Sequence, residues 1–276
     1  MLSIGWFSTG RGEGSRGLLQ FVQERILRGR LDAQIQFVFS NRAPGEAAGS
    51  DQFFDLVDRF GLPLVTLSSA EFRRRRGGTF ARHRAEFDQQ VSRLLAGRQP
   101  DLCVLAGYML ILGGVMCRRF PFLNLHPALP DGPIGTWQEV VWQLIETRAS
   151  QTGTMIHLAT EAVDRGPVVA YCTVPIVGGR FKAHWEDLGR QDVSQIKARE
   201  GEDFQLFRLI RQAQYQREPY LLFETLRTVA AGPGSPEASQ RLGQLRDRPG
   251  KYLLPEGICL DQEINRAMIE DGLRTG

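Results

Sequence analysis

An asparagine and a histidine two positions apart, Asn124 and His126, are the residues of this chain best placed to do chemistry. Pro127 follows directly and disfavours the α-helical conformation for the histidine, so this stretch should be extended. The apolar run over 120–125 predicts a short buried strand that ends at these residues. Because alternate residues of a strand point to the same face, the amide and the imidazole should project side by side.

A carboxylate, Asp164, completes the set of groups. It lies in a Gly/Pro-containing turn before a second apolar strand, so it can reach the end of the first strand. The three groups suit attack on a carbonyl, with an amide N–H and an imidazolium facing the developing oxyanion. The carboxylate would raise the pKa of the imidazole and pass protons through a water. The structural alternative is a histidine satisfied by a backbone carbonyl near a turn, which is the commoner role for an Asn-x-His-Pro sequence.

The elements that must position these groups alternate between apolar runs and amphipathic stretches. This rhythm predicts an α/β fold, an open, mostly parallel twisted sheet with helices on both faces. In such sheets ligands bind beyond the carboxyl ends of the strands, where the residues above are expected to lie. We expect strands over 2–8, 34–39, 63–67, 102–106, 120–125, 154–158 and 168–174, and helices over 15–28, 52–60, 80–95, 137–147 and 203–227, the last interrupted near Pro219.

Several segments, in order, resemble the folate-dependent formyltransferases, most closely their phosphoribosylglycinamide branch. The third and fourth are the more specific, because the family's catalytic Asn, His and Asp fall on Asn124, His126 and Asp164. The similar segments are Phe7–Ser15, Asp101–Leu112, Leu123–Pro130, and Thr152–His157 continuing to Val163–Val169.

The resemblance implies an enzyme that transfers a formyl group from 10-formyltetrahydrofolate, as co-substrate, to a primary amine. Glycinamide ribonucleotide, in purine synthesis, is the first acceptor that it implies. It also implies that His157 supports the carboxylate, and that Met109, Leu110, Ile111 and Leu112 line the folate pocket. A core turn after the preceding strand would explain the last four residues equally well.

A Gly-rich loop follows the first expected strand and opens a helix. Its backbone N–H groups, over Arg11, Gly12, Glu13, Gly14 and Ser15, are predicted to bind a phosphate at the positive end of the helix. Arg11 and Arg16 could add charge. The glycine spacing is not that of a dinucleotide-binding loop and no P-loop lysine follows, which disfavours a nucleotide-dependent oxidoreductase or an ATPase. The alternative is a plain turn with Ser15 as the helix N-cap.

The most basic stretch, Arg73–Gly78, is expected to be a solvated loop between a strand and a helix. Its alternative role is the steering of a polyanionic ligand, either a phosphate or the polyglutamate tail of a folate.

Departures from the family pattern bear on the acceptor. Leu110 stands where the family has an arginine, and the loop over 130–137 is unlike the family's basic, histidine-containing loop. These differences keep two alternatives open. The acceptor could be another amine, such as a nucleotide-sugar amine or an aminoacyl group, or the chain could be a non-catalytic folate- or phospholigand-binding paralogue.

Residues 1–231 are expected to form the formyltransferase-like α/β domain, with 178–217 as an insertion. Residues 232–276 then form a linker and a C-terminal extension. The apolar patch Tyr252–Pro255 is too small for a core of its own, so the extension should pack on the domain as a short strand pair followed by a helix over Asp261–Glu270.

Composition narrows the classes of protein to which the chain could belong. Apolar content of 42%, charged content of 24% and a net charge of +3 over 276 residues are ordinary for a globular protein and give no reason to expect nucleic-acid binding. No apolar run is long enough to span a membrane, and we expect no secretory leader. The cysteines lack metal-ligand spacing, so we expect no metal site and a reduced, cytoplasmic setting. The expected partner is a small, phosphorylated amine, and a homodimer is compatible with the sequence.

Overall fold

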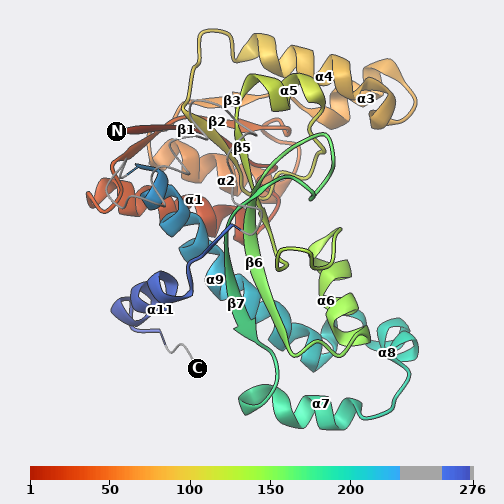
Figure 1. Cartoon of the computed structure of the whole chain (residues 1–276). Coiled ribbons are helices and arrows are strands. Elements are labelled where there is room, and N and C mark those ends of the chain that lie inside the picture. Colours follow the sequence, from red (N-terminus) through yellow and green to blue (C-terminus); the bar gives the residue numbers. More distant parts are fainter. Residues whose placement is uncertain (231–256, 274–276) are drawn as a thin grey trace.

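The computed structural model describes residues 1–230 and 257–273, and its frame is an 8-stranded sheet with the order β3-β2-β1-β4-β5-β6-β7-β8 (Figure 1). The strands are β1 (Leu2–Phe7), β2 (Ala33–Ser40), β3 (Leu64–Thr66), β4 (Leu102–Leu105), β5 (Phe122–His126), β6 (Gln151–Leu158), β7 (Val168–Pro175) and β8 (Ile258–Cys259).

The pairing is mostly parallel. Strands β3, β2, β1, β4 and β5 all run the same way, whereas β6 is antiparallel to both β5 and β7. The carboxyl ends of five neighbouring strands therefore lie at one edge of the sheet, which is where ligands bind in folds of this kind. The predicted fold class is confirmed.

Helices cover both faces of the sheet (Figure 1). Buried side chains of α1, α2, α9 and α11 pack on one face, and those of α3, α4 and α5 pack on the other. In β1, Ile4 and Trp6 belong to the first layer and Phe7 to the second, as alternation along a buried strand requires. The helices are α1 (Glu13–Leu27), α2 (Ala48–Arg59), α3 (Ser69–Arg76), α4 (Phe80–Leu94), α5 (Gly114–Arg119), α6 (Trp137–Glu146), α7 (Lys182–Leu188), α8 (Val193–Glu200), α9 (Gln205–Ala230) and α11 (Asp261–Glu270).

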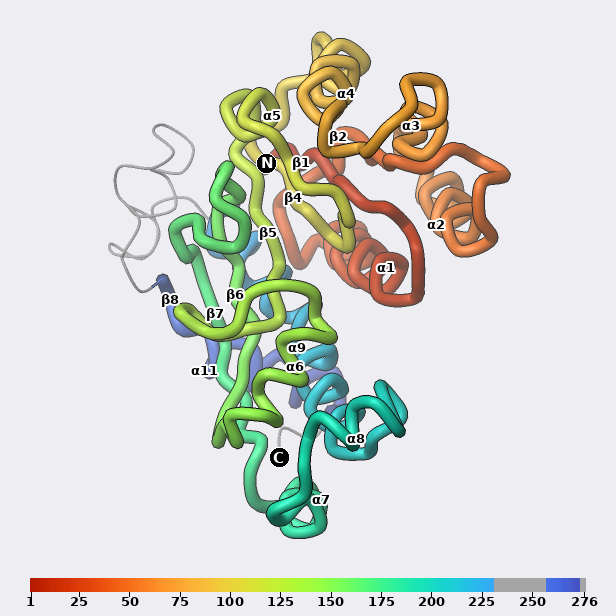
Figure 2. The backbone as a smooth tube through the Cα atoms, turned by 90° about the vertical axis from the view of Figure 1, so that its right-hand side faces the viewer, coloured from red at the N-terminus to blue at the C-terminus, as the bar shows by residue number. Residues whose placement is uncertain are grey.

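A separate apolar cluster lies toward the far ends of β6 and β7. There α6, α7 and α8 gather against the first half of α9 (Figure 2). Val174 and Ile176 connect this cluster to the sheet. The helices α7 and α8 come from the stretch 178–217, which the sequence marked as an insertion.

Residues 257–273 pack on the domain. Strand β8 pairs in parallel with β7, and the Asp261 carboxylate accepts hydrogen bonds from the backbone N–H and the hydroxyl of Thr173. Helix α11 buries Ile264 and Met268 against α9 and the sheet. The helix has the bounds expected from the sequence, whereas the patch Tyr252–Pro255 lies outside the described residues.

Two local expectations are wrong. The arginine run Arg73–Arg76 is not a loop but the last turn of α3, a helix that begins behind the Ser68 N-cap. Helix α9 continues through Pro219 without interruption. A proline removes one helical hydrogen bond, and burial of the turn that follows it, over 220–223, outweighs that loss. No helix among the described residues is long and apolar enough to cross a bilayer.

Candidate active site

The antiparallel pairing of β5 with β6 places Asn124 directly opposite His157, and His126 opposite Met155. Directly opposed residues share a face, so the two histidines and the asparagine project together. The amide Nδ2 of Asn124 lies 3.0 Å from Nε2 of His157 and 3.3 Å from a carboxylate oxygen of Asp164. The side-by-side arrangement expected for Asn124 and His126, and their convergence with Asp164, are present.

The loop between β6 and β7 aims the carboxylate of Asp164. This residue has a φ of 53°, a left-handed conformation that Asp tolerates better than most residues. Gly166 fixes where the loop crosses β6, because a Cβ there would lie 1.7 Å from the carbonyl oxygen of Leu158. The same carbonyl faces Nδ1 of His157 at 3.0 Å. A glycine two residues after Asp164 therefore lets the loop close onto the histidine pair.

His157 is fully enclosed, with 1% of its surface exposed. When the ring is neutral, its Nδ1–H donates to the Leu158 carbonyl and its Nε2 accepts from the Asn124 amide. The amide can then donate its second hydrogen to Asp164. This orients both the asparagine and the carboxylate, and it is the position that the sequence assigned to a supporting histidine.

His126 is capped by the loop that follows it. Its Nε2 donates to the backbone carbonyl of Pro133 over 3.0 Å, and its Nδ1 lies 3.8 Å from Asp164. The second distance is too long for a direct hydrogen bond but short enough for electrostatic attraction when the ring is protonated. The loop between Leu129 and Trp137 thus covers a catalytic candidate, and the structural alternative stated for the sequence, a histidine satisfied by a backbone carbonyl near a turn, is present at His126.

Burial governs the protonation of His126. The pKa of the imidazole is lowered from its usual value, first by desolvation and then by His157, against the raising effects of the Pro133 carbonyl and Asp164. Asp164 raises this pKa as expected, but desolvation of the enclosed ring is the larger effect, so the net shift is downward. The pKa of Asp164 is lowered, first by its contact with His157 and then by the neighbouring histidine charges and the N–H of Gly135, despite the opposing effect of burial.

Gln214 is a residue of this site that the sequence did not point to. It lies on α9 with no exposed surface, and its amide donates to the carbonyl of Pro127 over 2.8 Å and to the hydroxyl of Thr152 over 2.9 Å. The first bond holds the backbone immediately after His126. A glutamine far along the chain, on a long and largely buried helix, carries no sequence signal for this role.

The Gly-rich loop lies at the carboxyl end of β1, the neighbour of β4 in the sheet. Helix α1 starts at Glu13 with Gly12 as its N-cap, so the alternative of a Ser15 N-cap is wrong. Tyr215 lies 3.4 Å from the point where a Cβ on Gly14 would be. Because Tyr215 follows Gln214 in α9, one turn of helix contacts both the Gly-rich loop and the His126 segment.

The segment after β4 is split between solvent and core. Met109 and Ile111 are 61% and 45% exposed, whereas Leu112 is buried and Leu110 packs against the same cluster. Met109 and Ile111 therefore present apolar surface at the exterior, and Leu110 and Leu112 hold the segment on the core.

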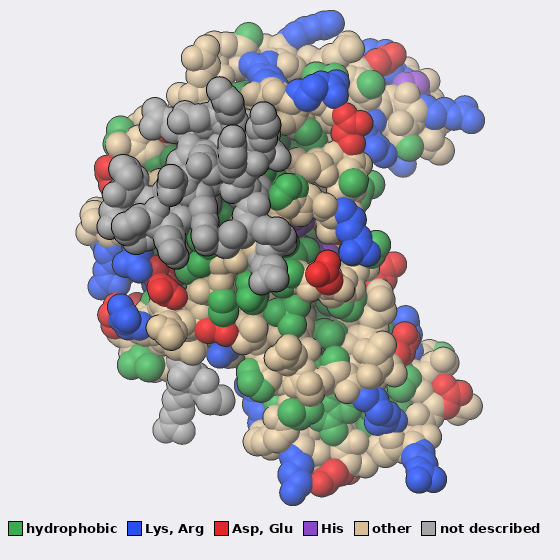
Figure 3. Space-filling view, in the orientation of Figure 1, with side chains coloured by type: hydrophobic (Ala, Val, Ile, Leu, Met, Phe, Trp, Pro, Cys, Tyr) green, Lys and Arg blue, Asp and Glu red, His purple; other side chains and the backbone are tan. Residues whose placement is uncertain are grey.

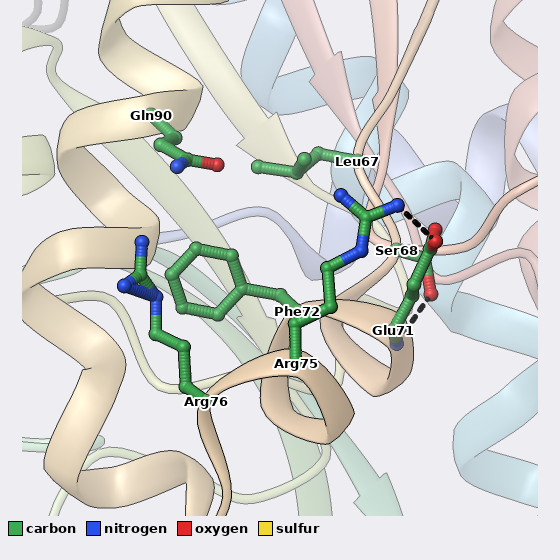
Figure 4. A pocket seen from close by; sticks show the side chains of 7 residues that line it. All are labelled: Leu67, Ser68, Glu71, Phe72, Arg75, Arg76 and Gln90. Carbon is green, nitrogen blue, oxygen red and sulfur yellow. Dashed lines mark hydrogen bonds and ion pairs between the residues drawn. The ribbon is translucent and has the colours of Figure 1, made fainter.

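A hollow opens on one side of the molecule, between the part with α3 and α4 and the part with α6 and α8, and histidine side chains are visible in it (Figure 3). A pocket of about 280 Å³ lies between α3 and α4 (Figure 4). Its arginines are already paired, Arg75 with Glu71 and Arg76 with Glu86. It is lined by Leu67, Ser68, Glu71, Phe72, Arg75, Arg76 and Gln90, none of which belongs to the Asn124–His126–Asp164 group.

Comparison with known proteins gives a consistent result. The sequence profile described as formyl transferase matches residues 12–191, a range that contains Asn124, His126, His157 and Asp164. The chain is 28% identical over 173 residues to the trifunctional purine biosynthetic protein adenosine-3 of Homo sapiens, covering 62% of this chain and 15% of that one. It is 33% identical over 106 residues to phosphoribosylglycinamide formyltransferase of Saccharomyces cerevisiae, covering 36% of this chain and 50% of the relative.

The match thus spans half or less of these two relatives. Among solved structures, glycinamide ribonucleotide transformylase 1 from Symbiobacterium toebii superposes with a TM-score of 0.59 at 25% identity, covering 84% of this chain and 88% of that chain.

Proposed function

This chain belongs to the formyl transferase family, and we propose that it transfers a formyl group from 10-formyltetrahydrofolate to the primary amine of glycinamide ribonucleotide in purine synthesis. The observation that carries the proposal is the enclosed group formed by Asn124, His126, His157 and Asp164 at the carboxyl edge of the sheet. Amide, imidazole and carboxylate groups meet there within hydrogen-bonding or ion-pairing distance.

In the proposed reaction the amine nitrogen attacks the formyl carbon, a new C–N bond forms, and the carbonyl oxygen gains negative charge. His126 and Asn124 supply N–H donors to that oxygen, and Asn124 does so by turning the hydrogen that it otherwise directs to Asp164. Such donors are worth most in an enclosed site. The lowered pKa of His126 keeps its imidazole neutral at neutral pH, so Nε2–H is the donor it offers. In this structure the Nε2–H of His126 donates to the backbone carbonyl of Pro133, so the loop must move away before His126 can donate to the oxyanion.

Proton transfer falls to Asp164. Its pKa is lowered, so it is a carboxylate at neutral pH and can take the proton that the attacking amine loses, directly or through a water. The old bond to the folate nitrogen then breaks, and that nitrogen receives a proton. His157 holds the carboxylate and the Asn124 amide in place throughout.

The acceptor side rests on the Gly-rich loop. The helix α1 has no side-chain cap at its start among the described residues, so its first-turn N–H groups can bind the phosphate of a ribonucleotide. Tyr215 near Gly14 and Gln214 on Pro127 connect this loop and the His126 segment through adjacent residues of α9, which supports one ligand that contacts both. The formyl donor needs an apolar surface for the flat ring of the folate, and the exposed side chains of Met109 and Ile111 fit that need.

One observation favours a different acceptor. Glu13, in the first turn of α1, brings a negative charge to the helix end where the phosphate would bind. An amine without a phosphate, or one with a phosphate placed elsewhere, would avoid this repulsion. Formyl transfer to another amine is therefore the second candidate.

We place either enzyme in the cytoplasm, a reducing setting that suits the free thiols of Cys103, Cys117, Cys172 and Cys259.

The test is an assay of formyl transfer from 10-formyltetrahydrofolate to glycinamide ribonucleotide and to a panel of other primary amines. His126→Ala removes the proposed donor, and His83→Ala, on α4, is the matched control. We expect turnover with glycinamide ribonucleotide that His126→Ala lowers by about two to three orders of magnitude and His83→Ala retains. Turnover with another amine alone would overturn the acceptor. Folate binding without transfer to any amine would overturn the enzyme assignment and support the non-catalytic paralogue.

A further inference from the structure

A line of side-chain hydrogen bonds crosses the carboxyl ends of four parallel strands. The backbone N–H of Met109, after β4, donates to the hydroxyl of Thr9, after β1, over 2.8 Å. That hydroxyl donates to the Asn41 side-chain oxygen, after β2, over 2.7 Å. The Asn41 amide donates to the hydroxyl of Ser69, after β3, over 3.0 Å. The order of these residues follows the order of the strands, β4-β1-β2-β3.

Thr9 and Asn41 are well suited to this position because each has both a donor and an acceptor in use. They are 2% and 3% exposed, so water does not replace a lost partner easily. Inside a protein such connected bonds polarise one another, and a donor left without an acceptor is costly. Backbone bonds reinforce the line, from Thr9 N–H to the Gly107 carbonyl over 3.0 Å and from Ser69 N–H to the Asn41 carbonyl over 2.9 Å.

We propose that Thr9 and Asn41 are positioning residues that align the donor segment at Met109 with the acceptor loop at Gly10–Ser15. The inference rests on the proposed function, which assigns the folate to the first segment and the acceptor phosphate to the second. Thr9 joins the two segments directly, because it precedes Gly10 and its hydroxyl receives the Met109 N–H. Asn41 orients that hydroxyl by accepting its hydrogen.

The decisive variant is Thr9→Val, which keeps the shape of the side chain and removes the hydroxyl. Thr9→Ser keeps the hydroxyl and is the conservative rescue. Thr154→Val is the matched control, because Thr154 is fully buried on β6 and its hydroxyl has no partner within the described part of the chain. Kinetic constants are measured for 10-formyltetrahydrofolate and for glycinamide ribonucleotide. Thermal stabilisation by 5-formyltetrahydrofolate and by glycinamide ribonucleotide reports binding without turnover.

We expect Thr9→Val to raise KM for both substrates by about tenfold, since a buried N–H and an amide oxygen lose their partner. The kcat at saturation should stay within about threefold, because Asn124, His126 and Asp164 are untouched. Thr9→Ser and Thr154→Val should match the wild type in both KM values. Asn41→Ala, which leaves the Met109–Thr9 bond in place, should show the same pattern in a weaker form.

Unchanged KM values, or a rise in only one of them, would overturn the alignment. If Thr9→Val does not fold, Asn41→Ala decides the question by the same criterion. A wild-type protein without formyl transfer would sink the proposed function instead. In that case the alignment is judged by the two binding measurements, which must both weaken in Thr9→Val and stay unchanged in Thr154→Val.

Discussion

Two regions are conspicuous in the sequence, the polar residues of β5 and β6 and the arginine run of α3. In the fold the first region is buried and the second is exposed. His126 and His157 are 3% and 1% exposed, and both lie near the carboxylate of Asp164. The arginines of α3 are exposed, and the side chain of Arg75 is 76% exposed beside its partner Glu71. Enclosed groups feel a low dielectric, so position and proton affinity matter there, whereas exposed pairs are screened by water and salt. A run of charged residues in a sequence is therefore weaker evidence for a catalytic site than polar residues that are expected to be buried.

The largest effect that separates the two regions should come from the oxyanion donors. His126→Ala and Asn124→Ala should each lower turnover by about two to three orders of magnitude, because each removes one N–H from the developing oxyanion. Steady-state kinetics gives the result, and circular dichroism checks that the fold remains. Near-wild-type turnover in either variant would remove that residue from the proposed role.

The next effect comes from a residue that touches no substrate. Gly166→Ala introduces a Cβ that would lie 1.7 Å from the Leu158 carbonyl oxygen, so the loop must move and take Asp164 with it. Misplacement of a reacting group by about 1 Å can cost about a hundredfold in rate. We expect a loss of that size in kcat together with a lower melting temperature. Gly17→Ala, inside α1, is the control, because a Cβ there makes an ordinary contact of 3.6 Å with Tyr215. Equal kcat values for the two variants would refute the role of Gly166.

A smaller effect sharpens the electrostatic side of the comparison. His126 has a lowered pKa, so its NMR titration should fall below the usual histidine midpoint. Asp164 is one of the influences that raise this pKa, so Asp164→Asn should shift the midpoint further toward acid. The folded ring binds fewer protons than the unfolded one, so His126 weakens stability as the pH falls below the ordinary histidine range. A midpoint that moves upward in Asp164→Asn would contradict this account.

The smallest effect is expected on α3. Arg75→Ala and Arg76→Ala each break an exposed ion pair, which typically contributes less than about 1 kcal/mol. Turnover and melting temperature should therefore stay close to those of the wild type. A higher KM for the folate co-substrate that returns to the wild-type value at high salt would show instead that the run steers an anionic ligand.

What could be predicted from the sequence follows local rules. The alternation of Asn124 and His126 on a strand, the effect of Pro127, and the spacing of apolar runs depend on neighbours in the chain, and the sheet and its paired side chains agree with them. Features that escaped prediction depend on distant residues. Gln214 reaches Pro127 from helix α9, and the shape of a loop decides that the backbone carbonyl on His126 is that of Pro133. The direction of the His126 pKa shift could not be predicted for the same reason, since burial is a property of the whole fold.

The C-terminal segment has a consequence for the behaviour of the protein in solution. Without β8, strand β7 would be an edge strand of the sheet, and its backbone N–H and C=O groups along Ala170 and Tyr171 would be unpaired. Exposed edge strands of this kind recruit strands from other chains and seed aggregates. Ile258 and Cys259 occupy part of this edge, and the Asp261 carboxylate blocks the N–H of Thr173. The segment therefore protects the edge strand from pairing with other chains. A chain shortened before Ile258 should aggregate more readily even where its catalytic groups are intact.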